Sequence, residues 1–136
     1  MKRSGTGAFA LGAGEGWILE DKGYTFEVKL PERSGPGRLA VTLLVTTEDE
    51  WPGHTHRTED EVFYVLEGSL TFRCGDDQFD VDGGGFVFLP MGIQHGYKLR
   101  SPEARVLVAT SPAPEGEQPG WDGFLSGFED DCEFRG

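Results

Sequence analysis

Two of the three histidines in the sequence, His54 and His56, are separated by a single residue. In an extended segment, residues i and i+2 point to the same side with Cα atoms about 6.6 Å apart, so both imidazoles can reach one metal ion. Glu61 opens the next apolar segment, and His95 follows a proline-glycine turn. Three imidazoles and one carboxylate form a ligand set for a first-row transition metal, with positions left open for water, oxygen or substrate.

Strands are the elements expected to position these side chains. From Tyr24 to Leu30, apolar and polar residues alternate, which predicts a half-buried strand. The segment from Leu39 to Thr46 is apolar at nearly every position, which predicts a strand covered on both faces. Further short strands are predicted over residues 61–66, 70–74, 79–81, 86–89, 96–99 and 105–109. Gly, Asp and Pro separate them at a spacing typical of an antiparallel sandwich or barrel, so the predicted fold class is all-β.

The length of 136 residues suits one domain with a single core. We expect a flexible N-terminus over 1–16, a barrel over 17–110, and a loop with a C-terminal helical tail over 111–136. The helix is predicted because Trp121, Phe124, Leu125 and Phe128 fall on one helical face. This short C-terminal helix would pack on the outside of the barrel or cap its open end.

Charge and composition restrict the possible partners. The net charge of -12 would repel nucleic acid and anionic membrane surfaces, so neither is an expected partner. No apolar run approaches the 18 or so residues that cross a bilayer, and the start of the chain lacks a signal-peptide core, which favours a cytoplasmic protein. Cys74 and Cys132 match no metal or redox spacing.

The histidine pair belongs to a longer pattern that resembles the first signature of the cupin superfamily. That signature reads G, five residues, H-x-H, three or four residues, E, six residues, G. Its matching positions are occupied by His54, His56, Glu61 and Gly68, while Asp49 stands near the place of the leading glycine.

The second cupin signature reads G, five residues, P-x-G, two residues, H, three residues, N. It is matched by Gly84, Pro90, Gly92 and His95, with Leu99 in place of the asparagine. The chain thus resembles the small single-domain cupins of the quercetin-dioxygenase-like type. The resemblance implies a cupin jelly-roll β-barrel that is a homodimer, with one divalent Fe, Mn, Ni, Cu or Zn ion held by His54, His56, Glu61 and His95.

Aromatic side chains are expected around the ion. Phe63 follows Glu61 on the same face of its predicted strand, and Tyr97 follows His95 in the same way. Other candidates for the substrate pocket are Phe72, Phe86 or Phe88, and Trp51. Such a lining suits a small, mostly uncharged aromatic or polyketide-like ligand.

Three functions are compatible with these residues. The first is an enzyme, a mononuclear metal dioxygenase acting on a phenolic or enolic small molecule. The second is a metal-dependent polyketide cyclase or aromatase, in which the ion polarises a carbonyl. The third is a non-enzymatic, metal-stabilised ligand-binding barrel; isomerase or decarboxylase chemistry also stays open. In the enzyme hypotheses Glu61 is the candidate catalytic base as well as a ligand.

Overall fold

Short strands make up the described part of the chain, as the all-β prediction requires. The computed structural model describes residues 2–3, 5–30, 39–54, 60–111 and 133–135. Its strands are β1 (Lys2–Arg3), β2 (Phe9–Ala10), β3 (Gly16–Asp21), β4 (Tyr24–Leu30), β5 (Ala40–Thr46), β6 (Glu50–His54), β7 (Asp60–Glu67), β8 (Ser69–Cys74), β9 (Asp77–Asp82), β10 (Phe86–Leu89), β11 (His95–Leu99), β12 (Ala104–Ser111) and β13 (Glu133–Arg135). These residues include no helix that is long and apolar enough to span a membrane.

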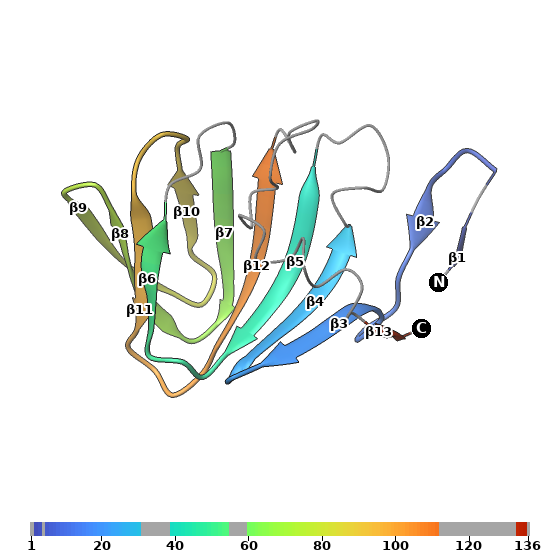
Figure 1. Cartoon of the computed structure of the whole chain (residues 1–136), viewed down its shortest axis with the longest axis horizontal. Coiled ribbons are helices and arrows are strands. Elements are labelled where there is room, and N and C mark those ends of the chain that lie inside the picture. The colour runs from blue at the N-terminus through green and yellow to red at the C-terminus, as the bar shows by residue number, and fades with distance from the viewer. Residues whose placement is uncertain (1, 4, 31–38, 55–59, 112–132, 136) are drawn as a thin grey trace.

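Two antiparallel sheets carry the architecture. The larger has seven strands in the order β10-β7-β12-β5-β4-β3-β13, and the smaller has four in the order β6-β11-β8-β9. Figure 1 shows the smaller sheet at the β10–β7 end of the larger one, while β4 and β3 extend away from it. Strands β1 and β2 pair separately. The fold is the jelly-roll arrangement expected from the sequence.

The burial of β4 and β5 agrees with the apolar patterns from which these strands were predicted. Phe26 and Val28 of β4 are buried, as a half-buried strand requires. Strand β5 is covered on both faces, because Leu44 faces the main core while its neighbour Leu43, 8% exposed, is buried on the opposite face. Both predictions are confirmed.

The main core lies between the two sheets. Strands β3, β4, β5, β7, β10 and β12 contribute side chains from the larger sheet, and β8 and β11 contribute from the smaller one. Its members are Leu19, Phe26, Val28, Leu44, Phe63, Val65, Leu70, Phe72, Cys74, Val87, Leu89, Tyr97, Leu99, Ala104, Val106 and Val108. Removal of these apolar side chains from water is the principal driving force for packing the sheets together.

The sequence did not reveal strands β1, β2, β3, β6 and β13. β6 contains Pro52 and Gly53, which are depleted in strands, and β13 has only three residues and pairs with β3. The predicted C-terminal helix around Trp121 and Phe128 lies outside the described residues. The flexibility of residues 1–16 stays a prediction, although this segment contains β1 and β2.

Gly68 makes the tight connection between β7 and β8. Its φ is +98°, a left-handed conformation that side chains rarely adopt. A Cβ atom here would lie 2.5 Å from the carbonyl oxygen of Glu103 and 2.9 Å from the Cα of Ala104. Only glycine therefore fits between this turn and the segment that enters β12.

Candidate functional site

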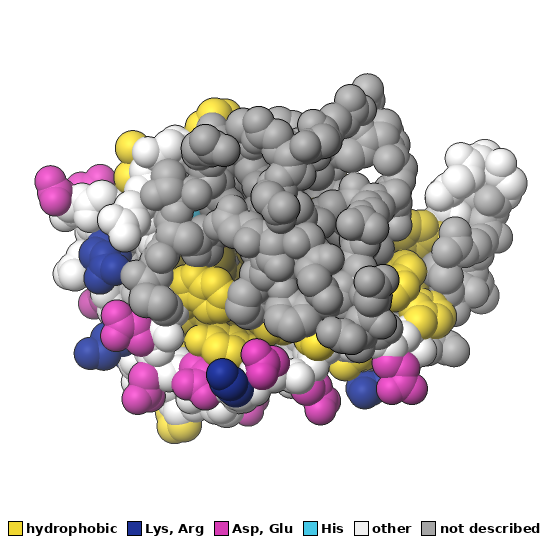
Figure 2. All heavy atoms as spheres, in the orientation of Figure 1, with side chains coloured by type: hydrophobic (Ala, Val, Ile, Leu, Met, Phe, Trp, Pro, Cys, Tyr) yellow, Lys and Arg dark blue, Asp and Glu magenta, His cyan; other side chains and the backbone are white. Residues whose placement is uncertain are grey.

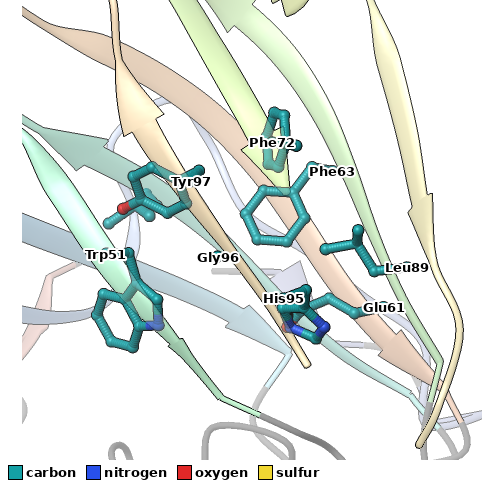
Figure 3. A pocket seen from close by; sticks show the side chains of 9 residues that line it. Trp51, Glu61, Phe63, Phe72, Leu89, His95, Gly96 and Tyr97 are labelled. Carbon is teal, nitrogen blue, oxygen red and sulfur yellow. Dashed lines mark ion pairs between the residues drawn. The ribbon is translucent and has the colours of Figure 1, made fainter. Parts of the chain in front are cut away.

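Glu61 and His95 meet between the sheets. Glu61 comes from β7 of the larger sheet, and His95 is the first residue of β11 in the smaller one. Nε2 of His95 lies 3.1 Å from Oε1 of Glu61, and each side chain is only 3% exposed (Figure 3). A buried nitrogen and carboxylate oxygen are thus held together inside a largely apolar barrel.

The two-residue period of the strands places aromatic rings beside this pair. Phe63 follows Glu61 on the inner face of β7, and Tyr97 follows His95 on the inner face of β11. The ring centroids of Phe63 and Tyr97 are 6.3 Å apart, and those of Phe63 and Phe72 are 5.1 Å apart. Edge-to-face packing across the sheets therefore fixes the aromatic wall next to the polar pair.

The remaining two candidate ligands come from the segment after Trp51. His54 ends β6, and its Cα is the antiparallel partner of the Cα of His95. The side chain of His54 and the whole of His56 lie outside the described residues. Within the part of the chain that the structure describes, no group of three or more His, Cys, Asp or Glu side chains could hold a metal. The four-ligand set consequently stays a prediction.

A small cavity opens beside Glu61 and His95 (Figure 3). It is lined by Leu44, Trp51, Glu61, Phe63, Phe72, Leu89, His95, Gly96 and Tyr97. The structure therefore brings all four aromatic residues suggested for the pocket to its wall, where their role in binding stays a prediction. The alternatives Phe86 and Phe88 are 59% and 45% exposed, on the outer face of β10.

Three lining residues were missed by sequence reasoning, namely Leu44, Leu89 and Gly96. Leu89 is the cross-strand partner of Glu61, and Gly96 lies between His95 and Tyr97. The register of β10 with β7 brings Leu89 to the site, and no motif encodes that register.

A family model described as the cupin domain matches residues 41–110, about half of the chain. The chain belongs to the cupin family. Over 67 residues it is 33% identical to an uncharacterized protein, SCO3923, of Streptomyces coelicolor, covering 49% of this chain and 60% of the relative. Over 108 residues it is 25% identical to quercetin 2,3-dioxygenase of Bacillus subtilis, covering 76% of this chain and 31% of the relative. The chain thus spans less than two thirds of the length of either relative.

Among solved structures, KdgF from Halomonas sp. resembles this cupin in fold. The TM-score is 0.65 with 16% sequence identity, over 79% of this chain and 96% of the other. At that identity the likeness concerns the fold alone. It agrees with the two-sheet arrangement described above.

This cupin departs from the family signatures at Asp49 and Leu99, and the two positions are in direct contact. The backbone N–H of Leu99 donates a hydrogen bond of 2.7 Å to the carbonyl oxygen of Asp49. The Leu99 side chain, 9% exposed, belongs to the main core. An apolar side chain thus packs where the signature has an amide, away from the Glu61–His95 pair.

Few charges surround the cavity of this cupin. Burial raises the pKa of the Tyr97 phenol, so that its ring stays neutral at ordinary pH. Carboxylates are instead found on the surface, and Figure 2 shows Asp and Glu scattered over the described part of one face with fewer Lys and Arg. The site is therefore an apolar aromatic cavity with one strongly polar corner.

Proposed function

We propose that this cupin binds one divalent transition metal ion (Fe, Mn, Ni, Cu or Zn) through His54, His56, Glu61 and His95. The observation that carries the proposal is the buried Nε2–Oε1 contact of 3.1 Å between His95 and Glu61. Two ligands bound to one ion at about 2.1 Å each, at a right angle, are separated by about 3 Å. The nitrogen and oxygen present thus fit adjacent positions around such an ion.

The activity we propose is that of a dioxygenase acting on a phenolic or enolic small molecule. In such a reaction both oxygen atoms of O₂ enter the organic product, and the substrate itself is oxidised, so no external reductant is required. A bound metal ion would supply Lewis acidity, which favours loss of the proton from a hydroxyl group beside it. The 25% identity to quercetin 2,3-dioxygenase of Bacillus subtilis supports this choice of reaction.

The chain's own residues have distinct roles in this proposal. Glu61 accepts the proton of the substrate hydroxyl, a transfer that typically contributes 10²- to 10⁴-fold in rate. Phe63, Phe72 and Tyr97 hold an aromatic ring by stacking and keep water from the polar corner. The cavity is small, so a ring-sized substrate enters when Trp51, the half-buried member of its wall, moves aside.

Metal analysis and oxygen uptake test the proposal together. Purified protein should carry about one transition-metal ion per chain, and a panel of phenols and enols should include one that causes metal-dependent oxygen consumption. Turnover of a polyketide-like substrate under nitrogen would instead establish the cyclase alternative. Metal binding with ligand affinity but no turnover in either atmosphere would establish a non-enzymatic binding protein.

We further propose that the protein is a homodimer formed through the outer face of the larger sheet. Five exposed apolar side chains lie together on that face: Tyr64, Leu66, Phe86, Phe88 and Leu107, which are 38–59% exposed. Tyr64 is the cross-strand partner of both Phe86 and Leu107, so the patch spans β10, β7 and β12. Contiguous apolar patches of this kind mark interaction surfaces.

The net charge of the chain favours a second copy of the same chain as the partner that covers this patch. Two chains that each carry -12 repel one another, so a contact free of carboxylates is where they can join. The patch lies at the β10 end of the larger sheet, whereas β13 forms the opposite edge. Light scattering after gel filtration should give twice the chain mass. Phe86→Glu should give the monomer, whereas the matched change Phe79→Glu on β9 should leave the dimer intact.

A further inference from the structure

Two threonine hydroxyls are buried on the inner face of the larger sheet without a hydrogen-bond partner. Thr42 of β5 is 1% exposed and Thr110 of β12 is 0% exposed. No atom of the chain that the structure describes accepts from or donates to the Oγ1 atom of either residue. Buried polar groups are nearly always paired, and leaving one unpaired costs stability, so two neighbouring exceptions require an explanation.

The strand register places both hydroxyls beside the cavity. Thr110 is the cross-strand partner of Glu61, an arrangement in which Cβ atoms are about 4.5–5.5 Å apart. Thr42 pairs with Val108, two residues before Thr110, and precedes the lining residue Leu44 by two positions on the same face of β5. The two threonines therefore lie on the same sheet face as the lining residues, Thr110 beside Glu61 and Thr42 near Leu44, just outside the set that lines the cavity. We call Thr42 and Thr110 the threonine shelf.

A third threonine on the same sheet face provides an internal comparison. Thr46 of β5 is 0% exposed, as buried as the threonine shelf. Its hydroxyl accepts a hydrogen bond of 3.0 Å from the backbone N–H of Glu48. Burial on this face is thus compatible with a satisfied hydroxyl, and the threonine shelf is distinguished by its unpaired hydroxyls and by the position of Thr110 next to Glu61.

We infer that the threonine shelf binds an oxygen atom of the small molecule held at Glu61, so that the preferred ligands carry oxygens on neighbouring carbon atoms. This inference rests on the proposed function, because it assumes that a ligand hydroxyl lies at Glu61. Since Thr110 is directly opposite Glu61 on the neighbouring strand β12, the second oxygen must be close to the first. Vicinal diols of aromatic rings and enediols have that geometry, whereas simple phenols lack the second oxygen.

Equilibrium binding of catechol and phenol to the metal-loaded protein under nitrogen tests the inference without any turnover. Wild type should bind catechol about tenfold more tightly than phenol, a ratio that corresponds to one good hydrogen bond to a buried group. Thr110→Val and Thr42→Val should reduce this preference to less than threefold and leave phenol binding unchanged. Thr110→Ser, which keeps the hydroxyl, should retain the preference, as should the matched control Thr46→Val.

Thermal unfolding of the ligand-free protein supplies a second readout. Thr42→Val and Thr110→Val should melt no lower than wild type, because each removes a hydroxyl that has no partner, whereas Thr46→Val should melt lower. A catechol preference that persists in both shelf variants would show that the metal alone selects catechol and would overturn the inference. So would a loss of stability in the shelf variants equal to that of Thr46→Val, since the hydroxyls would then be paired within the protein or with an ordered water. Absence of binding of either ligand to wild type would overturn it as well, whereas failure of the proposed function would show in metal content and oxygen uptake.

Discussion

Oε1 of Glu61 and Nε2 of His95 are 3.1 Å apart although the two residues belong to different sheets. Both side chains are buried among apolar rings, where a polar group is costly unless it is paired. The contact thus joins the two sheets through a polar pair within their largely apolar packing. It also makes each residue sensitive to loss of the other.

His95→Ala should lower the metal content of the purified protein to less than about a tenth of an ion per chain, because it removes one of four ligands. Elemental analysis of protein dialysed against metal-free buffer measures the occupancy. The neighbouring exposed residue provides the control, since Gln94→Ala should keep wild-type occupancy. Full metal occupancy of the His95→Ala protein would show that the metal binds elsewhere.

Glu61→Gln separates the two roles of Glu61. A carboxylate that both binds the ion and takes a proton should, when replaced by the amide, leave most of the metal bound while turnover falls by about 10²-fold or more. Metal content and turnover should be measured on one preparation. Parallel losses of both would reject the role as a base, and unchanged turnover would reject the catalytic role entirely.

Gly68→Ala should destabilise the protein by about 2 kcal/mol or more, because the left-handed φ and the contact with Glu103 both oppose a Cβ atom. Chemical denaturation measures the change in free energy of unfolding. Gly5→Ala is the control, since no atom lies within 4 Å of a Cβ at that position. Equal stability of the two variants would mean that the β7–β8 turn relaxes freely.

Asp82→Asn should lower the melting temperature slightly at pH 7 and not at all near pH 2. Hydrogen bonds from Ser69 and Arg100 lower the pKa of the Asp82 carboxyl, and its Oδ1 lies 3.1 Å from the Arg100 guanidinium. A lowered carboxyl pKa contributes stability above the unfolded value of about 3.9. That contribution is lost as the pH falls through the folded pKa. A difference that persists undiminished at pH 2 would contradict the electrostatic origin.

Sequence patterns were sufficient to predict a strand where the order of apolar and polar residues along the segment indicates which faces are buried. The alternation from Tyr24 to Leu30 gave β4 with its exact bounds, and continuous apolarity from Leu39 to Thr46 gave a strand buried on both faces. Strand β6 was missed because Pro52 and Gly53 argue against a strand, and its pairing with β11 overrides that local preference.

Only part of the candidate site could be predicted from the sequence. The spacing of the motifs identified Glu61 and His95 as candidates. The contact between them arises from the packing of two sheets, and the spacing of residues along the chain does not predict that packing. The same limit applies to Phe86 and Phe88, whose outward direction follows from the register of β10 with β7. The unpaired hydroxyls of Thr42 and Thr110 are likewise visible only once three strands are aligned.

The position of β12 has a consequence for biosynthesis. This strand is made after both of its neighbours, β5 and β7, yet it lies between them in the larger sheet, where they are not paired with each other. Until residue 111 has left the ribosome, β5 and β7 each present an unpaired edge, and the sheet cannot close. Exposed strand edges recruit other chains, so the nascent protein is prone to aggregation until β12 has been added to the sheet.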